Sequence, residues 1–417
     1  MNTTNKKEKQ LVGAVLIGQS GGPTAVINAS AYGVIKTALG AKNVTRVLWA
    51  GHGIKGVLDD NIYEMGAEDG NELALLLQTP AAEFGSCRKK IREEHEYARI
   101  LEIFKKYDVR YFFYNGGNDS MDTCNKINDY MNRHGHPIRV WGVPKTIDND
   151  LDVTDHCPGF GSAAKYVATT CMEISRDSHA YDTGQVTVIE IMGRNAGWLT
   201  GASALATKAG AGPDLIYLPE TVFDIEVFLS TVEKLYKTKK NIVVAVSEGI
   251  RDKNGKYIAE YAAGPAGAKD SFGHAQMGGV APILAGAVKG KLGVKVRGIE
   301  LSLLQRCAAH CASATDVEES YAAGKAAVDA AVAGMTDKMA GFECSRQGGK
   351  YTCDIKLFDL ADVANTEKMI PAEWINAEGN NVNRQYIDYA LPLIQGEARP
   401  PFENGVPRFA KLKKEFV

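Results

Sequence analysis

Short apolar runs alternate with amphipathic stretches along most of the chain, and this alternation predicts its secondary structure. The apolar runs are rich in β-branched and aromatic residues and mostly end at glycine or proline, which is typical of buried strands. Strands are expected at residues 11–17, 44–50, 108–114, 138–143, 185–192, 214–218, 242–246 and 294–301. Helices are expected at residues 24–39, 224–238 and 315–333, with others ending near residues 131, 177 and 208, and a hairpin around Gly348-Gly349.

Strands that alternate with helices predict an α/β protein with mainly parallel sheets. At 417 residues the chain is longer than one ordinary hydrophobic core, so more than one lobe is expected. In such folds ligands bind at the carboxyl ends of the strands. The residues that follow each expected strand are therefore the first place to look for chemistry.

A polar cluster follows the expected strand at 138–143. It reads Pro144-Lys145-Thr146-Ile147-Asp148-Asn149-Asp150. Carboxylates beside a lysine suit phosphoryl transfer, because one can accept a hydroxyl proton, another can hold a divalent metal, and the lysine can neutralise the moving phosphoryl group. The alternative is a polar loop with a surface ion pair.

Two further strand ends carry glycine-rich turns. Gly18-Gln19-Ser20-Gly21-Gly22-Pro23 lies between an expected strand and a helix, where backbone N–H groups can cradle a phosphate; a plain tight turn is the alternative. Asn115-Gly116-Gly117-Asn118-Asp119-Ser120 repeats this arrangement. Between them, Gly85-Ser86-Cys87-Arg88-Lys89-Lys90 is either a phosphate-contacting loop or a solvated helix start.

Composition narrows the classes of partner and compartment. The formal net charge of −2 gives no reason to expect nucleic acid or an anionic membrane, and no apolar run approaches the length of a membrane span. The eight cysteines lack C-x-x-C or zinc-ligand spacing. Residues 1–10 are polar and lysine-rich, so we expect a disordered tail there instead of a secretion signal, and a reduced, cytoplasmic protein.

On these residues the chain resembles the phosphofructokinase family, and within it the pyrophosphate-dependent branch. The shared motifs run from Gly21-Gly22-Pro23 to about Gly324 and comprise Gly116-Gly117-x-Asp119-Ser120, Pro144 to Asp150, Met192-Gly193-Arg194, Glu248-Gly249, and Arg297 nine residues before Arg306. The resemblance implies two facing Rossmann-like lobes, each a three-layer α/β arrangement with a mainly parallel sheet, and an active site in the cleft between them. It implies a donor-side lobe of residues 10–155 plus about 305–345, a sugar-phosphate lobe of 156–304, and a C-terminal extension of 346–417.

The resemblance implies reversible transfer of a phosphoryl group from pyrophosphate to the 1-hydroxyl of fructose 6-phosphate, giving fructose 1,6-bisphosphate and phosphate. It gives catalytic roles to Asp148 as general base and to Lys145, Thr146 and Arg194. The substrate contacts it implies are Gly21, Gly22, Arg88, Asp119, Thr146, Ile147, Asp148, Met192, Gly193, Arg194, Glu248, Arg297 and Arg306. Mg²⁺ is the implied cofactor, held by Asn118 and Asp150, and Arg297 would come from a neighbour in a homodimer or homotetramer.

The choice of phosphoryl donor depends on two positions. ATP-using members carry glycine where this chain has Asp119 and Lys145. The Asp119 carboxylate would repel the α-phosphate of ATP, and the Lys145 cation would stabilise charge developing on pyrophosphate. Together they predict selection for pyrophosphate.

Several positions depart from the family pattern. Asn118 stands where a metal-binding aspartate is usual, and Leu303 and Gln185 replace polar contacts to the sugar phosphate. The chain carries no cation between Gln19 and Lys36, so weak or no nucleotide regulation is expected. The open alternatives are an ATP-dependent phosphofructokinase, a pyrophosphate-dependent kinase of sedoheptulose 7-phosphate, and a non-catalytic regulatory subunit that binds sugar phosphates.

The histidines do not enter this hypothesis. His156 and His179 lie near motifs but have no partner that the sequence identifies, so core or surface roles are expected. His274, in a glycine-rich loop, resembles a sugar contact, although the Arg297 to Arg306 spacing accounts better for that role.

Overall fold

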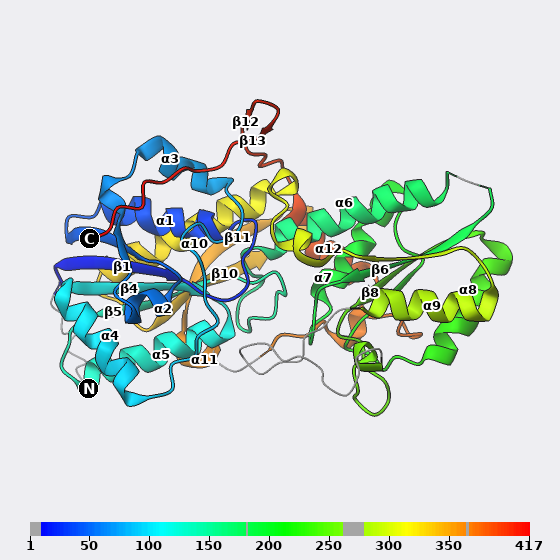
Figure 1. Cartoon of the computed structure of the whole chain (residues 1–417), viewed down its shortest axis with the longest axis horizontal. Coiled ribbons are helices and arrows are strands. Elements are labelled where there is room, and N and C mark those ends of the chain that lie inside the picture. The colour runs from blue at the N-terminus through cyan, green and yellow to red at the C-terminus, as the bar shows by residue number, and fades with distance from the viewer. Residues whose placement is uncertain (1–9, 181, 262–278, 364–366) are drawn as a thin grey trace.

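The apolar strand runs form two separate sheets, and each sheet is the middle layer of one lobe in the computed structural model of the chain (Figure 1). The structure describes residues 10–180, 182–261, 279–363 and 367–417. The N-terminal tail and His274 therefore lie outside the described residues. The fold confirms the expected α/β class with mainly parallel sheets.

The first lobe is built on a seven-stranded sheet. In spatial order its strands are β11 (Thr352–Asp359), β10 (Lys338–Ser345), β5 (Arg139–Pro144), β4 (Val109–Gly116), β1 (Gly13–Gln19), β2 (Val44–Ala50) and β3 (Ile62–Glu64). The strands from β10 to β2 are parallel, and the two edge strands β11 and β3 are antiparallel to their neighbours. After β2 and β3 the chain returns to the other side of β1 to form β4, so the direction of winding reverses between β1 and β4, where such folds bind ligands.

Helices cover both faces of this sheet. One face packs against α1 (Ile27–Leu39) and α10 (Ala314–Val332) through a core that includes Ile35 and Val328. The other face packs against α4 (Glu94–Lys106), α5 (Asn118–Arg133) and α11 (Leu360–Val363) through residues such as Phe104 and Met121. The short helices α2 (Ile54–Leu58) and α3 (Gly70–Ala74) complete the lobe.

The second lobe repeats the three layers on a smaller scale. Its four parallel strands are, in spatial order, β7 (Leu215–Tyr217), β8 (Asn241–Ser247), β6 (Gln185–Ile191) and β9 (Val296–Glu300). One face packs against α6 (Phe160–Ser178), α7 (Trp198–Gly201) and α12 (Arg384–Ala390). The other packs against α8 (Ile225–Thr238) and α9 (Val280–Leu292).

The segment after residue 345 does not form a separate unit. The hairpin around Gly348-Gly349 is confirmed, and its second strand, β11, pairs along its full length with β10 and so extends the first sheet. Helix α12 then joins the core of the second lobe, where Tyr386 and Tyr389 pack on Trp198. The chain ends on the first lobe after the small hairpin β12 (Phe402–Glu403) and β13 (Val406–Pro407) (Figure 1). The proposed boundary of 346 for the extension therefore falls inside the β10–β11 hairpin.

The predicted strands are confirmed to within a few residues at their ends, but some elements had no clear sequence signal. Strand β3, helix α4 and helix α9 were not anticipated. The segment expected as a helix to residue 208 is α7 followed by a 3₁₀ helix over Ala202–Ala209. The Gly85 to Lys90 segment is an irregular loop, so the helix-start alternative is wrong.

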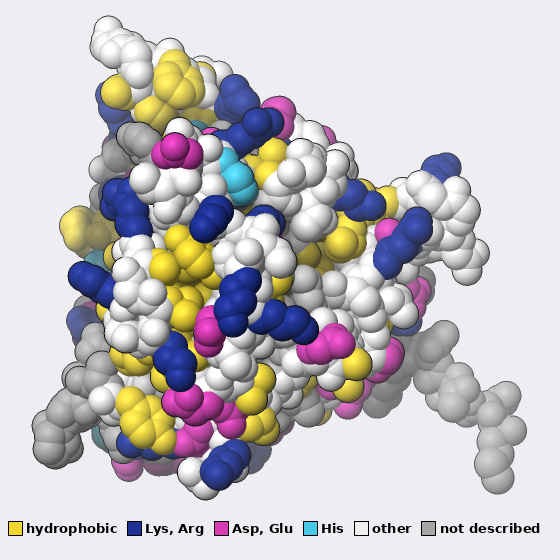
Figure 2. Space-filling view, turned by 90° about the vertical axis from the view of Figure 1, so that its right-hand side faces the viewer, with side chains coloured by type: hydrophobic (Ala, Val, Ile, Leu, Met, Phe, Trp, Pro, Cys, Tyr) yellow, Lys and Arg dark blue, Asp and Glu magenta, His cyan; other side chains and the backbone are white. Residues whose placement is uncertain are grey.

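The exposed end of the second lobe carries charges of both signs. Figure 2 shows Lys and Arg side chains beside Asp and Glu on this face, with apolar side chains between them. In the described part of the chain, no helix combines the length and apolarity that a membrane crossing requires.

Candidate active site

The three strand ends singled out in the sequence meet at one edge of the first sheet. Strands β5, β4 and β1 are neighbours, so their carboxyl ends lie side by side. Backbone hydrogen bonds link the turns that follow them: Ser20 N donates to Asn115 O at 2.9 Å, and Lys145 N donates to Gly116 O at 3.1 Å. The strand-end motifs therefore form one continuous polar wall.

This wall faces the second lobe across a cleft of about 790 Å³. The cleft is lined from both lobes and includes most of the predicted site residues. These are Gly21, Gly22, Arg88, Asn118, Asp119, Lys145, Thr146, Ile147, Asp148, Asp150, Met192, Arg194, Glu248 and Arg306. Gly193 and Arg297 are not among the lining residues.

The first glycine-rich turn is shaped to receive a cation. Gly21 has φ of +76°, and a Cβ placed on it would lie 2.8 Å from the Lys145 Nζ. A Cβ on Gly22 would lie 3.2 Å from Arg306 Nη1. Glycine leaves this space to the two side chains, so the turn allows two cations to lie at the same wall of the cleft.

The loop that carries Arg88 is fastened to the same turn. Ser86 Oγ donates to Gly21 O at 2.7 Å, and Gly21 N donates to Cys87 O at 3.0 Å. Arg88 is itself exposed and lines the cleft. These bonds hold the loop near Lys145, and they explain why the segment is not a helix.

Within residues 146–150, every residue except Asn149 lines the cleft. Asp148 and Asp150 line the cleft, whereas Asn149 is fully buried. The Asn149 amide donates to Tyr389 Oη at 2.8 Å, and its carbonyl oxygen accepts from Cys157 N at 2.9 Å. Asn149 has φ of +57°, a conformation that asparagine tolerates better than most residues. The buried amide thus holds both aspartates toward the cleft.

Desolvation dominates the electrostatics of this loop. It raises the pKa of Asp148, while Lys145, Arg194 and Arg306 act in the opposite direction. Burial lowers the pKa of Lys145 to about 8, although Asp148 and Asp150 favour its charged form. Burial and the charge of Asp148 raise the pKa of Asp150 to about 7. The cleft therefore holds groups that titrate near neutral pH, as proton transfer requires.

The second lobe contributes two stacked turns at the ends of neighbouring strands β6 and β8. A Cβ placed on Gly249 would lie 1.9 Å from Arg194 O, so only glycine allows the Glu248-Gly249 turn to approach the Met192-Gly193-Arg194 turn. Gly193 N donates to Glu248 Oε1 at 3.4 Å. Burial and Asp148 raise the pKa of Glu248 to about 7. Gly193 thus shapes this wall through its backbone.

The guanidinium groups of the cleft are poised for an anion. The Nε atoms of Arg194 and Arg306 are buried and have no hydrogen-bond partner among the described residues. Burial and the nearby Arg88 lower the pKa of Arg306. Crowded cations with unused buried donors are stabilised when an anion such as phosphate binds between them.

The structure also reveals cleft residues that the sequence did not indicate. Asn195 Nδ2 donates to Glu367 Oε1 at 3.0 Å, and Asn195 Oδ1 accepts from Arg251, whose guanidinium also donates to Tyr257 Oη. Asn195 directly follows Arg194 in the sequence, so it could have been included among the predicted site residues for that reason. Glu367 comes from the chain beyond β11 and has no motif that marks it.

Two predicted residues have surroundings that bear on their roles. Asp119, in the first turn of α5, forms an ion pair with Lys90 at 2.9 Å at the rim of the cleft. Arg297 lies on β9, at the edge of the second sheet, and its side chain is exposed. It can therefore contact another molecule but does not reach the cleft of its own chain.

Two facing α/β lobes, with carboxylates and cations lining the cleft between them, are typical of a phosphotransferase. The phosphofructokinase family model matches residues 14–299, and the chain belongs to that family.

The chain is also similar to named proteins over nearly its whole length. It is 45% identical over 416 residues to a pyrophosphate–fructose 6-phosphate 1-phosphotransferase of Xanthomonas campestris, covering 97% of each chain. It is 44% identical over 407 residues to the enzyme of that name from Halomonas elongata, covering 96% of each. The crystal structure of a pyrophosphate-dependent phosphofructokinase from Marinobacter aquaeolei superposes with a TM-score of 0.88 at 41% identity, covering 97% of each chain.

Proposed function

We propose that this chain is a diphosphate–fructose-6-phosphate 1-phosphotransferase. It moves a phosphoryl group from pyrophosphate to the 1-hydroxyl of fructose 6-phosphate and gives fructose 1,6-bisphosphate and phosphate. The near full-length similarity to enzymes of that name supports this assignment. The reaction exchanges one phosphoanhydride for an ester and is reversible, so it serves glycolysis or gluconeogenesis.

The observation that carries the proposal is the environment of Asp148. Its half-buried carboxyl group lines the cleft, and the charges of Lys145, Arg194 and Arg306 act on it. A carboxylate with a raised pKa is a better proton acceptor than an ordinary aspartate. Asp148 takes the proton of the sugar 1-hydroxyl as that oxygen attacks the phosphoryl group.

The donor binds along the first lobe. The backbone N–H of Gly22, together with Lys145 and Arg88, supplies a hydrogen-bond donor and positive charge to pyrophosphate, while Gly21, whose own N–H is bonded to Cys87 O, leaves space for the Lys145 side chain. Lys145 stabilises the charge that develops on the leaving phosphate, and a buried ammonium acts more strongly than an exposed one.

The sugar phosphate binds along the second lobe. Arg194 contacts the transferring phosphoryl group, Glu248 accepts hydrogen bonds from sugar hydroxyls, and Arg306 pairs with the 6-phosphate. Arg297 extends from its edge strand toward the 6-phosphate of a neighbouring subunit, so the working form is a homodimer or homotetramer. Paired guanidinium donors suit a phosphate better than a lysine would.

Asn118 and Asp150 would hold Mg²⁺. Oxygen ligands are the ones Mg²⁺ prefers. Burial, followed by the charges of Asp148 and Glu367, raises the pKa of Asp150, and a bound divalent cation would lower it again. When bound, the ion neutralises the charge of pyrophosphate. Asn118 is a weaker ligand than aspartate, so Asp150 carries more of the binding.

The eight cysteines are all free thiols, which supports a reducing, cytoplasmic location.

The test is formation of fructose 1,6-bisphosphate from fructose 6-phosphate and Mg²⁺, with pyrophosphate or ATP as donor. Turnover with pyrophosphate and not with ATP is expected. Asp148→Asn should lower kcat by about 10²–10⁴ with little change in KM, since it removes the general base. Asp177→Asn, at an exposed aspartate of α6, is the matched control. Full turnover in Asp148→Asn would refute the mechanism, and turnover with ATP alone would refute the donor assignment.

A further inference from the structure

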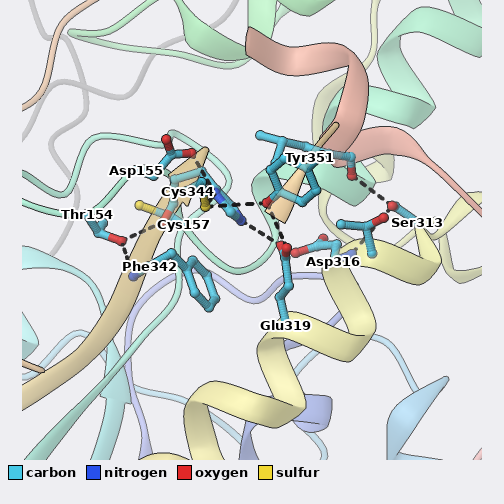
Figure 3. Close-up of polar contacts among 12 residues, drawn as sticks. Thr154, Asp155, Cys157, Ser313, Asp316, Glu319, Phe342, Cys344 and Tyr351 are labelled. Carbon is cyan, nitrogen blue, oxygen red and sulfur yellow. Dashed lines mark hydrogen bonds and ion pairs between the residues drawn. The ribbon is translucent and has the colours of Figure 1, made fainter. Parts of the chain in front are cut away.

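A cluster of titratable side chains lies outside the cleft, where the loop after β5 meets α10 and the β10–β11 hairpin. Figure 3 shows Asp155, Cys344, Tyr351 and Glu319 converging there from separate segments of the chain. None of them lines the cleft, and the proposed reaction uses none of them. They surround the buried imidazole of His156.

The contacts of His156 require a charged ring. Its Nδ1 lies 3.0 Å from Asp155 Oδ1, and its Nε2 lies 2.8 Å from Glu319 Oε2. Each ionised carboxylate only accepts, so both ring nitrogens must donate and the imidazole is a cation. Burial opposes this charge, but the hydrogen bonds to the two carboxylates raise the pKa of His156 well above its ordinary value.

Cys344 lies against this cation. Its Sγ is 3.8 Å from His156 Nδ1 and 3.5 Å from Tyr351 Oη. A hydrogen bond from Cys353 and the neighbouring imidazolium lower the pKa of the Cys344 thiol to about 6. Thiolates stabilised in this way, and partly open to solvent, are the reactive ones in proteins.

A second cysteine lies directly opposite. In the antiparallel ladder of β10 and β11, Cys344 pairs with Cys353. Directly opposed residues have Cα atoms about 4.5–5.5 Å apart, within the range of about 4.4–6.8 Å that a disulfide spans. Cys353 alternates with the exposed Thr352 and Asp354, so it shares the inner face of the hairpin with Cys344.

A metal site is the competing explanation of this cluster. Asp155, His156 and Cys344 offer ligand atoms within 4.8 Å of one another. However, both Asp155 oxygens already accept hydrogen bonds of 2.8 Å from the Arg346 guanidinium. A metal ion would have to displace this cation and strip a proton from His156, so the geometry favours thiol chemistry.

We propose that Cys344 and Cys353 form a reversible, peroxide-responsive disulfide pair, with Cys344 as the reacting thiolate and Cys353 as the resolving thiol. The Cys344 sulfur attacks one oxygen of hydrogen peroxide, the O–O bond breaks, and the leaving hydroxide takes up a proton to become water. The Cys353 sulfur then attacks the resulting sulfenic acid, its proton leaves with the departing hydroxide as a second water, and the S–S bond forms. Two thiols lose two electrons, and one peroxide gains them. Disulfides of this kind in cytoplasmic proteins are typically redox-sensing.

The test uses the full-length protein at pH 6, treated with hydrogen peroxide, alkylated and mapped by mass spectrometry. A Cys344–Cys353 disulfide should form and be reversed by a dithiol. The lowered pKa of Cys344 gives it a larger thiolate fraction than an ordinary thiol has, and this outweighs the lower nucleophilicity of a low-pKa thiolate. Loss of the Cys344 thiol should therefore outpace that of the exposed Cys307 by about ten-fold.

Two variants separate the roles of the neighbours. Cys353→Ser should stop at a sulfenic acid on Cys344, which dimedone captures, and Glu319→Gln should slow the first step several-fold by weakening the imidazolium. Circular dichroism checks that both variants fold. If either variant does not fold, the ratio of Cys344 to Cys307 reactivity in the wild-type protein still tests the proposal. Equal reactivity of these two cysteines would refute the proposal. Stoichiometric zinc that is retained by the wild type and lost in Cys344→Ser would refute it in favour of a metal site.

Discussion

At the scale of single residues, the cleft depends on which side chains of the 145–150 loop are turned toward it. Lys145 is almost completely buried beside Gly21, Asp148 and Asp150 line the cleft, and Asn149 is tied to Tyr389 behind them. The loop therefore separates a buried structural amide from two carboxylates that line the cleft, within three consecutive residues.

The lowered pKa of Lys145 predicts the alkaline limit of activity. Above about pH 8 its ammonium loses its proton and with it the positive charge on the donor side, so kcat/KM should fall there. Lys145→Arg should abolish this alkaline fall in kcat/KM, because arginine stays charged. The maximum kcat/KM of this variant should be lower than that of the wild type. The measurement is kcat/KM for pyrophosphate from pH 6 to 9.5, with the exposed Lys208→Arg as control. If Lys145→Arg shows the same alkaline fall in kcat/KM as the wild type, the fall must come from the titration of another group.

Asp119 and Lys145 should determine the choice of donor. The double substitution Asp119→Gly and Lys145→Gly removes the repulsive carboxylate and the pyrophosphate-binding cation together. The ratio of kcat/KM with ATP to that with pyrophosphate should rise on the order of 10²-fold. Lys90→Ala is the control, because it removes the ion-pair partner of Asp119 and leaves the carboxylate in place. Loss of pyrophosphate use without any gain with ATP would contradict this assignment.

At the scale of elements, the second wall of the cleft depends on two strand-end turns packed without space for a side chain. Strands β6 and β8 are neighbours, so the Gly193 and Gly249 turns meet directly after them. The contact aims Arg194 and Glu248 into the same cleft. The close approach of the two turns therefore positions both Arg194, the predicted phosphoryl ligand, and Glu248, the predicted sugar ligand.

Gly249→Ala should separate these turns. Its Cβ would overlap Arg194 O, so we expect a loss of about 1–3 kcal/mol in the free energy of unfolding and a marked fall in kcat/KM for fructose 6-phosphate. Urea unfolding and steady-state kinetics measure the two effects. Gly286→Ala, in α9, should leave activity unchanged, because apart from the backbone of its own helix no described atom lies within 4 Å of the added carbon. Wild-type kinetics in Gly249→Ala would show that the turns can move apart at no cost.

At the scale of the whole molecule, one protomer brings together every predicted site residue except Gly193, which acts through its backbone, and Arg297. Arg297 is exposed on the edge strand β9. An assembly in which it completes a neighbouring cleft predicts complementation between two defective variants.

Asp148→Asn and Arg297→Ala should each be nearly inactive at low fructose 6-phosphate. After unfolding and refolding together, mixed dimers should regain about a quarter of wild-type activity, because half of the dimers then contain one intact cleft with an intact neighbouring arginine. Each variant refolded alone is the control. Activity equal to the average of the two parents would mean that Arg297 serves its own chain or none.

The sequence by itself determined the class of fold, the strand ends and the identity of most cleft residues. Apolar periodicity and turn glycines are local signals, and parallel strands present their carboxyl ends at one edge of a sheet. Gly21, Lys145 and Asp148 could therefore be grouped from their positions along the chain. Arg194, Glu248 and Arg306 were expected at the site because their motifs resemble those of the phosphofructokinase family.

Only the tertiary structure decided what residues distant in sequence do. Glu367 reaches the cleft, and Tyr389 orients the 145–150 loop, because the chain after β11 crosses back over both lobes. His156 had no partner that the sequence could identify, since Glu319 lies 163 positions away and Cys344 lies 188 away. Contacts of this kind arise from burial of complementary charges between separate elements, and no local pattern of residues encodes them.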